Sequence, residues 1–459
     1  AEFTSYPEIF GLKFPDDNAE EAFSVYDHPK VRIFKKTPFY NHEKALLILG
    51  NTNWDEIVLF TPKMATKAPT ALFFSSTLWE KYKKEGTWSE IFKRSSIVNK
   101  IPVLIWVIVL EILGLISAPY LFVVCRNLPD RGYSIAKITG LLLAGWSIWL
   151  LASFHILSFN RTGIILVVFF IVIISLLLCI IKWRDFSTFW KRNKNLLLIE
   201  EGIFWIFFIT FLMIRWANPD LWHPAMGGEK PMDFAYLNGV IKSSWFPPYN
   251  PWFSKGYLNY YYFGFVLIGT IIKVTGILPR IAYNLAIPTL FAMTATGAFG
   301  ATLALINKDI KSIKGKDMAI SLLGPLFVCV TGNLGEIKLI IQGLSILSDQ
   351  AGKSLIPVVF KVFHGFILLL KGHTLPIRNE WWYWNATRVI SYESSEAVPI
   401  TEFPWFTYLY GDLHAHAMGL PLTIVVIVLI IAIIRSTRIT PFLICFIALF
   451  TGALWPTNT

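Results

Sequence analysis

Cysteine is scarce in this sequence of 459 residues: only four are present, all within apolar segments. Their spacing indicates neither a disulfide framework nor a zinc site. Charged residues are also few, at 15% of the chain, whereas 54% of residues are hydrophobic and 16% aromatic. This balance exceeds what a soluble domain tolerates and indicates a polytopic membrane protein.

No signal peptide is visible, and the first residue is Ala1 rather than Met. We expect a piece of a longer polypeptide. The formal net charge of +11 comes from short Lys and Arg clusters beside apolar runs. In that position basic residues set membrane topology, so we expect no nucleic-acid partner.

Residues 1–100 mix charges of both signs with short apolar runs and turn signals. They predict a small extramembrane α/β region, with a solvated linker as the alternative. The remaining chain contains apolar segments close to the roughly 20 residues needed to cross a bilayer. About eight such segments are predicted to be transmembrane helices: Ile101–Val124, Ala136–Phe159, Thr162–Trp183, Leu196–Ile214, Ile281–Ile306, Met318–Val330, Ala417–Ile434 and Pro441–Leu454.

Two further apolar stretches, Tyr260–Ile277 and Leu355–Leu370, are ambiguous. Basic loops prefer the cytoplasm. All the short basic loops lie on the cytoplasmic side only if neither stretch crosses the membrane and the first helix runs from outside to inside. The basic cluster Lys93–Lys100 then lies outside. We therefore predict that both stretches lie on, or dip into, the outer leaflet as interfacial helices. The basic loops are 126–131, 182–194, 308–316 and 435–438.

This topology predicts a multi-pass protein of the cell's cytoplasmic membrane with large extracytoplasmic loops. The predicted parts are an extracytoplasmic region at 1–100, a four-helix membrane segment at 101–214, a first outer loop at 215–280, a helix pair at 281–330, a second outer loop at 331–416 and a helix pair at 417–459.

The first outer loop contains Glu229 and Asp233, four residues apart, which a helix would place on one face together with the following Tyr236. Such an acid could act as a general base on an acceptor hydroxyl. It could also hold a divalent cation that neutralises a leaving phosphate. The structural alternative is a carboxylate that caps a helix or pairs with Lys230 or Lys242.

The second outer loop ends with Asp412, His414 and His416 in alternation. An extended segment would place all three on one face. Carboxylate and imidazole together suit Zn or Mn better than Mg, so these residues are candidate metal ligands. The alternative is a polar helix cap that faces lipid headgroups.

Aromatic runs in both loops predict an interfacial belt, or stacking of Tyr260, Tyr261 and Trp382 on a sugar or prenyl chain. Arg388 beside the Trp cluster could clamp a phosphate, because guanidinium groups match phosphate oxygens. Within the spans, Glu111 is an acid without an evident partner, which is a functional hypothesis by default.

The motifs GGEKPMDFAYLN, PPYNPWF, GYLNYYYFG, TEFPWF and GDLHAH, in this order over residues 200–459, resemble a prokaryotic membrane-protein family named for its Tyr-Tyr-Tyr (YYY) motif. That family is similar to the GT-C membrane glycosyltransferases, in which an acid of the first outer loop is essential. The resemblance implies a catalytic role for Asp233 and substrate contact for Tyr236. Met232 stands where a first acid is common, which leaves metal use open.

Residues 1–100, with AFSVYDHPKVRIFKK and GTWSEIFKR, resemble the extracytoplasmic tail of a mannosyltransferase-like module. Together the resemblances imply a GT-C-like glycosyltransferase that takes sugar from a polyprenyl-phosphate donor on the extracytoplasmic face. Asp233 would be the base, assisted by Glu229. The expected cofactor is a divalent metal (Mn, Mg or Zn). The expected partners are the lipid-linked donor, membrane lipids, and other membrane subunits or the rest of a longer polypeptide.

Two other functions fit the sequence. A non-catalytic membrane assembly or anchoring subunit of a cell-surface complex would need no substrate site. It would be favoured if Asp233 lay more than about 15 Å from Asp412, because one substrate could not bridge that gap. A transporter of lipid-linked sugars would need a polar path across the bilayer, of which the spans offer little apart from Glu111.

Overall fold

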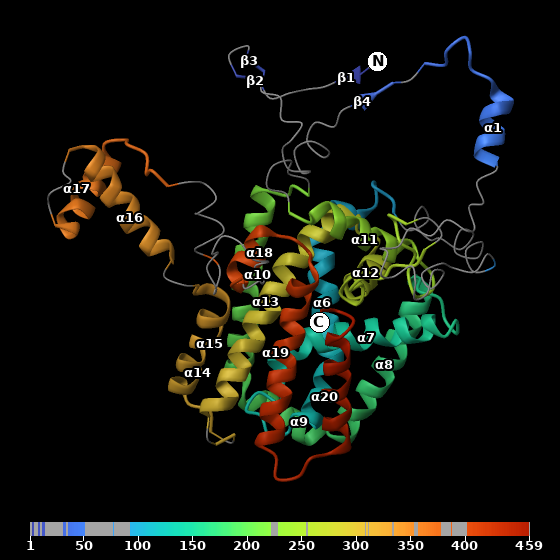
Figure 1. Cartoon of the computed structure of the whole chain (residues 1–459). Coiled ribbons are helices and arrows are strands. Elements are labelled where there is room, and N and C mark those ends of the chain that lie inside the picture. Colours follow the sequence, from blue (N-terminus) through green and yellow to red (C-terminus); the bar gives the residue numbers. More distant parts are fainter. Residues whose placement is uncertain are drawn as a thin grey trace.

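The chain forms a bundle of helices in the computed structural model (Figure 1). The residues described are 2–3, 8–9, 12–13, 31–33, 35–50, 77, 92–221, 228–253, 256–307, 309–310, 312–332, 335–352, 357–377, 387 and 402–458.

Six helices of the described chain are long and apolar enough to cross a membrane. They are α6 (Pro102–Val124), α7 (Ala136–Ser153, preceded by the short helix η2, Tyr133–Ile135), α8 (Arg161–Ile181), α10 (Lys194–Ala217), α13 (Pro279–Ile306) and α19 (Ala415–Ile434). The chain is therefore a polytopic α-helical membrane protein, as its composition predicts.

The other two predicted spans differ from expectation. Pro441–Leu454 forms α20, whose 14 residues are too few for a full span. The predicted span Met318–Val330 is divided among α14 (Gly315–Ser321), α15 (Leu323–Pro325) and the π-helical η3 (Leu326–Val330). This group makes an angle of 62° with α16 (Gly335–Gln350), and the two together would make a seventh span. Six or seven spans, rather than eight, are thus supported.

The helix α13 lies at the centre of the bundle, and most of its residues are buried. Small residues allow close helix packing around it. Where α7 crosses α6, a Cβ atom on Gly140 would lie 2.1 Å from the carbonyl oxygen of Leu113. Membrane helices associate through such close approaches of their backbones.

Two ambiguous apolar stretches form helices of 13 residues, α12 (Phe263–Thr275) and α17 (Val358–Leu370). Both are shorter than a span. Nearly all of α12 is buried, so protein encloses it rather than leaving it on an outer surface. It lies beside α11 (Lys230–Lys242) at the upper end of the bundle, near α18 (Pro404–Tyr410) (Figure 1).

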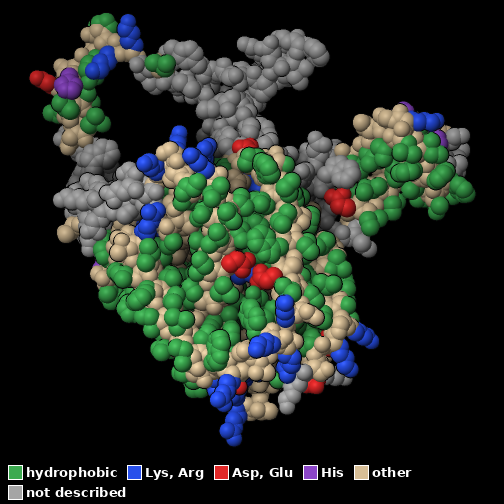
Figure 2. Space-filling view, turned by 180° about the vertical axis from the view of Figure 1, so that it is seen from behind, with side chains coloured by type: hydrophobic (Ala, Val, Ile, Leu, Met, Phe, Trp, Pro, Cys, Tyr) green, Lys and Arg blue, Asp and Glu red, His purple; other side chains and the backbone are tan. Residues whose placement is uncertain are grey.

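The basic loops meet at the opposite end, near α9 (Trp183–Arg192). There Arg126 donates to the carbonyl of Arg438 at 3.3 Å, and Arg435 donates to that of Asn307 at 2.8 Å. Arg192 reaches the carbonyl of Ile310 at 3.4 Å. Figure 2 shows a wide apolar surface with Lys and Arg side chains grouped at its lower end and a further group at its upper left. The four short basic loops therefore share one end of the bundle, as the charge-based topology requires.

Glu111 has a partner that the sequence did not reveal. The ammonium group of Lys137 on α7 lies 3.1 Å from Glu111 of α6 and 2.6 Å from Glu201 of α10. The Tyr133 hydroxyl also donates to Glu201, at 2.8 Å. These four residues form an ionic cluster that joins three membrane helices, which corrects the reading of Glu111 as an isolated acid.

The predicted α/β region at residues 1–100 is not supported by its described part. Two antiparallel pairs of two-residue strands join β1 (Glu2–Phe3) to β4 (Val31–Arg32) and β2 (Glu8–Ile9) to β3 (Leu12–Lys13). The helix α1 (His42–Gly50) has no buried residue. A domain needs packed layers around a hydrophobic core, and these described elements form none.

Candidate active site

Two helix N-termini from distant parts of the chain meet at the upper end of the bundle. Glu229 is the residue before α11, and His414 is the residue before α19. The backbone N–H of Glu229 donates to Asp412 Oδ2 at 2.9 Å. The N–H of Leu413 donates to the Tyr283 hydroxyl at 2.7 Å, which fixes the second segment on α13. The two candidate segments therefore form one site.

The close approach depends on a glycine. Gly228 has φ +59°, a left-handed conformation that suits residues without a Cβ atom. A Cβ atom there would lie 2.4 Å from Asp412 Oδ2 and 2.4 Å from the Tyr410 ring. Any other residue at this position would force the Asp412 and Tyr410 side chains to move.

Three side chains define the centre of the site. Asp233 is fully buried, and among the described residues neither of its carboxyl oxygens has a hydrogen-bond partner. His414 Nδ1 lies 3.8 Å from Asp233 and contacts the Glu229 carboxylate, whose side chain is 54% exposed. His414 Nε2 lies 2.9 Å from the Tyr260 hydroxyl. Glu229 thus stands at the mouth, while Asp233 lies beneath it.

Burial and mutual repulsion raise the pKa values of the three carboxyl groups of the site. Burial raises the pKa of Asp233 well above its ordinary range, and Asp412 and Glu229 raise it further, whereas Lys230 opposes them. The pKa of Glu229 is raised by burial and by Asp412. Burial also raises the pKa of Asp412, although the Lys230 charge and the N–H of Glu229 act against it. A carboxyl group whose pKa is raised in this way is suited to proton transfer.

The imidazole of His414 is neutral at physiological pH, because burial and the neighbouring His416 lower its pKa to about 4. A carboxylate only accepts hydrogen bonds, so ionised Glu229 requires the proton on Nδ1. Nε2 then accepts from the Tyr260 hydroxyl. Glu229, His414 and Tyr260 consequently form a hydrogen-bonded chain across the mouth of the site.

The raised pKa of Asp233 predicts a pH-dependent effect on stability. A carboxyl whose folded pKa exceeds its unfolded value favours folding at low pH, and this contribution is lost as the pH rises through the folded pKa. An Asp233→Asn variant has no carboxyl group at this position, so its stability does not fall with pH for this reason. Its Tm is therefore expected to exceed the wild-type Tm by a margin that grows as the pH rises above about 4. Thermal unfolding in detergent across this pH range measures the margin, and a margin independent of pH would contradict the prediction.

The predicted metal ligands are held by other partners. Asp412 lies 3.3 Å from the Lys230 ammonium, and His416 lies 3.4 Å from Glu402. His414 is engaged with Glu229. No group of three or more His, Cys, Asp or Glu residues in the described chain is arranged to hold a metal ion. The expected divalent metal therefore does not fit this arrangement of Asp412, His414 and His416.

The predicted substrate-binding tyrosines line the site. The Tyr236 and Tyr260 rings lie 5.3 Å apart, and the Tyr260 and Tyr261 rings lie 5.2 Å apart. Their hydroxyl-bearing rings offer both stacking surface and hydrogen bonds. The predictions for Trp382 and Arg388 fall on positions outside the described residues.

Two cations belong to the site: Lys230, which was predicted as a possible partner for the acids of the first outer loop, and Arg215, which was not predicted. Lys230 pairs with Asp412 and also lies over the Tyr410 ring, 4.6 Å from its centroid. Arg215, at the end of α10, is buried and donates to Asn284 at 2.8 Å. Its Nη1 lies 2.8 Å from where a Cβ atom of Gly411 would be. A charge at the end of an apolar span is the signal that could have identified Arg215.

A groove of about 670 Å³ opens beside Arg215. Apolar residues of α6, α10 and α13 form most of its wall, together with Trp216, which is exposed. Arg280 adds a second cation to the lining. The groove combines an apolar surface with two guanidinium groups near the acid site.

Comparison with known proteins gives one match. A family model described as "Uncharacterized membrane protein (DUF2298)" matches residues 143–459, which is more than half of the chain and includes the whole candidate site. No curated protein and no solved structure matches the chain.

Proposed function

We propose that this chain, which belongs to the DUF2298 family of uncharacterized membrane proteins, transfers a sugar from a polyprenyl-phosphate donor to a hydroxyl acceptor. The observation that carries the proposal is the buried carboxyl of Asp233, which has no hydrogen-bond partner among the described residues and lies beneath Glu229 and His414. A buried acid with a strongly perturbed pKa in such a cluster is typical of catalytic sites.

In this proposal Asp233 is the general base. It removes the proton of the acceptor hydroxyl while the acceptor oxygen forms a bond to the anomeric carbon of the sugar. The bond between that carbon and the phosphate oxygen breaks, and the phosphate leaves with the electron pair. Glu229 and His414 cover Asp233 when no substrate is bound. The exposed Glu229 side chain moves aside to admit the acceptor, because catalytic hydrogen bonds often form only once substrate is bound.

The groove beside Arg215 suits the donor. Its apolar wall would receive the prenyl chain, while Arg215 and Arg280 attract the phosphate. Arg388 remains a proposed third cation for the leaving phosphate. Glycosyl transfer from an activated phosphate depends mainly on positioning and on charge stabilisation at the leaving group. In this proposal the guanidinium groups supply that charge stabilisation.

The position of the site favours the extracytoplasmic face. It lies at the end of the bundle opposite the basic loops (Figure 1), and basic loops prefer the cytoplasm. Polyprenyl-phosphate sugars presented in the outer leaflet would reach the groove from the side. An assembly subunit gains no specific support, because Asp412 binds the backbone of Glu229, one helical turn from Asp233.

A donor-selection assay tests the proposal. Purified chain in lipid vesicles is given a hydroxyl acceptor and radiolabelled sugar, either on polyprenyl phosphate or on a nucleotide. We expect transfer from the polyprenyl donor only, because the groove provides an apolar surface that a nucleotide cannot use. Transfer from the nucleotide sugar, or no transfer from a panel of polyprenyl-phosphate sugars, would overturn the proposal.

A further inference from the structure

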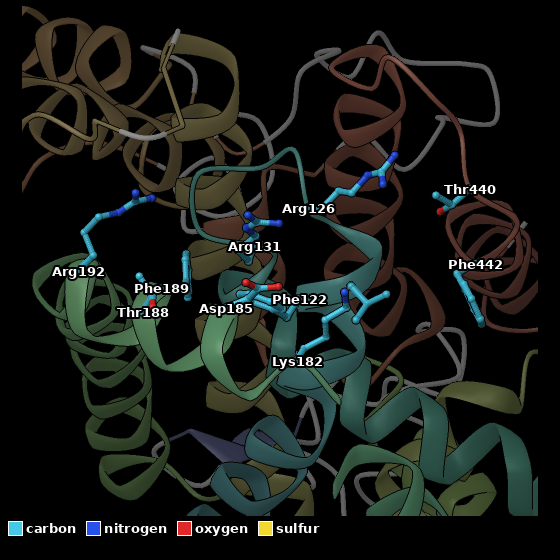
Figure 3. Close-up of a pocket in the computed structure, with 11 residues that line it drawn as sticks. Phe122, Arg126, Arg131, Lys182, Asp185, Thr188, Phe189, Arg192, Thr440 and Phe442 are labelled. Atoms are coloured by element: carbon cyan, nitrogen blue, oxygen red, sulfur yellow. The ribbon is translucent and has the colours of Figure 1, made fainter. Parts of the chain in front are cut away.

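A second cavity, drawn in Figure 3, lies at the basic end of the bundle. The acid site is at the opposite end (Figure 1). Its volume is about 470 Å³. Its walls are the end of α6 and the loop after it, α9, and the start of α20. Nothing in the proposed sugar transfer uses this cavity.

The cavity has an excess of positive charge. Arg126, Arg131, Lys182 and Arg192 line it, against the single carboxylate of Asp185. Within the described part of the chain, none of these four cations forms an ion pair. Among the described residues, the guanidinium groups of Arg126 and Arg192 donate to backbone carbonyls alone, at 3.3 and 3.4 Å. Four cations against one carboxylate favour a ligand with several negatively charged oxygens.

The loop that presents Arg131 is held in an unusual conformation. Arg131 has φ +56°, which is rare for a residue with a side chain. Asp130 is buried and accepts hydrogen bonds from the N–H of Gly132 at 3.0 Å and of Ser134 at 3.1 Å, which fixes the turn. The Arg131 guanidinium then lies 4.9 Å from the centroid of the Phe122 ring in the cavity wall. Backbone strain of this kind is often found at ligand sites.

The surroundings of the cavity indicate a lipid rather than a soluble anion. Phe442 lines the cavity and is 65% exposed. The opposite side of α9 borders an apolar groove of about 450 Å³, where Trp183 is 63% exposed. Exposed aromatics beside basic residues mark the interfacial depth of a membrane. The helix α9 thus lies at the interfacial depth of the membrane, with the basic cavity on one side and an apolar groove on the other.

We propose that this basic cavity binds the phosphate headgroup of an anionic phospholipid from the inner leaflet. The phosphate would lie among Arg126, Arg131 and Arg192, while the acyl chains follow the apolar surface beside Phe442. Basic pockets between membrane helices on the cytoplasmic side bind anionic headgroups in this way. The site is independent of the proposed sugar transfer, since it lies at the other end of the bundle.

Native mass spectrometry of the whole chain tests the proposal. Protein exchanged into mixed detergent with phosphatidylglycerol or phosphatidylcholine is expected to retain phosphatidylglycerol selectively. The double variant Arg126→Gln, Arg192→Gln should retain it about tenfold less, since charge-assisted hydrogen bonds are lost. Lys194→Gln removes one charge at the same end, from an exposed residue outside the cavity, and should retain lipid as wild type does.

Three results would overturn the proposal: equal retention of both lipids by wild type, equal losses in the double variant and in Lys194→Gln, or displacement of the lipid by millimolar inorganic phosphate. The last result would identify free phosphate as the ligand. The selectivity of wild type for phosphatidylglycerol needs no variant, so the test holds even if the double variant does not fold.

Discussion

An Asp233→Asn variant is expected to transfer sugar at least about 100-fold more slowly than wild type, because general-base catalysis contributes roughly 10²–10⁴ to a rate. Asparagine has nearly the same shape but cannot accept the proton. The Asp233 oxygens have no hydrogen-bond partner among the described residues, so the substitution costs no such bond. The wild-type rate should also rise with pH as Asp233 loses its proton, since burial raises its pKa. Initial rates with the polyprenyl donor measure both effects.

Two matched variants make this test specific. Glu43→Gln removes an exposed carboxylate on α1, a helix with no buried residue, and should keep the wild-type rate. Glu229→Gln retains a hydrogen-bonding side chain beside His414 and should slow transfer less than Asp233→Asn. If Asp233→Asn transfers at the wild-type rate, or Glu43→Gln loses as much activity, Asp233 is not the base.

The second large effect is on stability. Replacing Lys137 by Met leaves Glu111 and Glu201 on the membrane face without the cation that lies 3.1 and 2.6 Å from them. These side chains are only partly buried, at 12%, 30% and 23% exposed for Lys137, Glu111 and Glu201, but the surface they lie on faces lipid rather than water. Removing one member of an ion pair kept from water typically costs about 3–5 kcal/mol, because a charge is left without compensation. We expect a decrease of about 3 kcal/mol in the free energy of unfolding. Denaturant unfolding in detergent, followed by tryptophan fluorescence, measures it.

A triple variant provides the control for Lys137. Combining Lys137→Met with Glu111→Gln and Glu201→Gln removes all three charges together. Replacing a whole buried ionic group is often neutral or stabilising, so the triple variant should recover most of the lost stability. If it is as unstable as Lys137→Met alone, packing of the Lys137 side chain, and not charge compensation, explains the loss.

The membrane bundle could largely be predicted because a span requires a long apolar run, and the sequence displays such runs directly. Helix breaks are less visible. The apolar run of Met318–Val330 contains Pro325, and in the structure it divides into short segments. Proline inside a helix removes a backbone hydrogen bond and favours such breaks. Length alone also could not show that α12 is enclosed by neighbouring helices, since burial is set by tertiary packing.

The candidate site was predicted in composition more than in geometry. The predicted topology places Asp233 and Asp412 in the same compartment, and the structure brings their segments into contact. The pairing of Glu229 with His414 could not be predicted, because it depends on how two helix ends meet. The alternation of Asp412, His414 and His416 predicts a metal site because the sequence does not show which other side chains will contact these residues. Lys230 and Glu402, from outside the triplet, engage two of the three.

The preference of basic loops for the cytoplasmic side likewise predicts the position of the basic end but not its geometry. It predicted that four basic loops share one side, and their contacts agree. It could not predict that these loops enclose a cavity with Arg131 held over Phe122, because that geometry depends on the buried side chain of Asp130.

Photolabelling tests the central claim most directly, namely that the segments around Glu229 and His414 form one site for a lipid-linked sugar. A polyprenyl-phosphate sugar with a photoreactive group on the sugar is crosslinked to the chain in vesicles, and the labelled peptides are sequenced. The account predicts label on both segments, 228–236 and 410–416, with protection by unlabelled donor. Label on neither segment, or on the basic end alone, would contradict it.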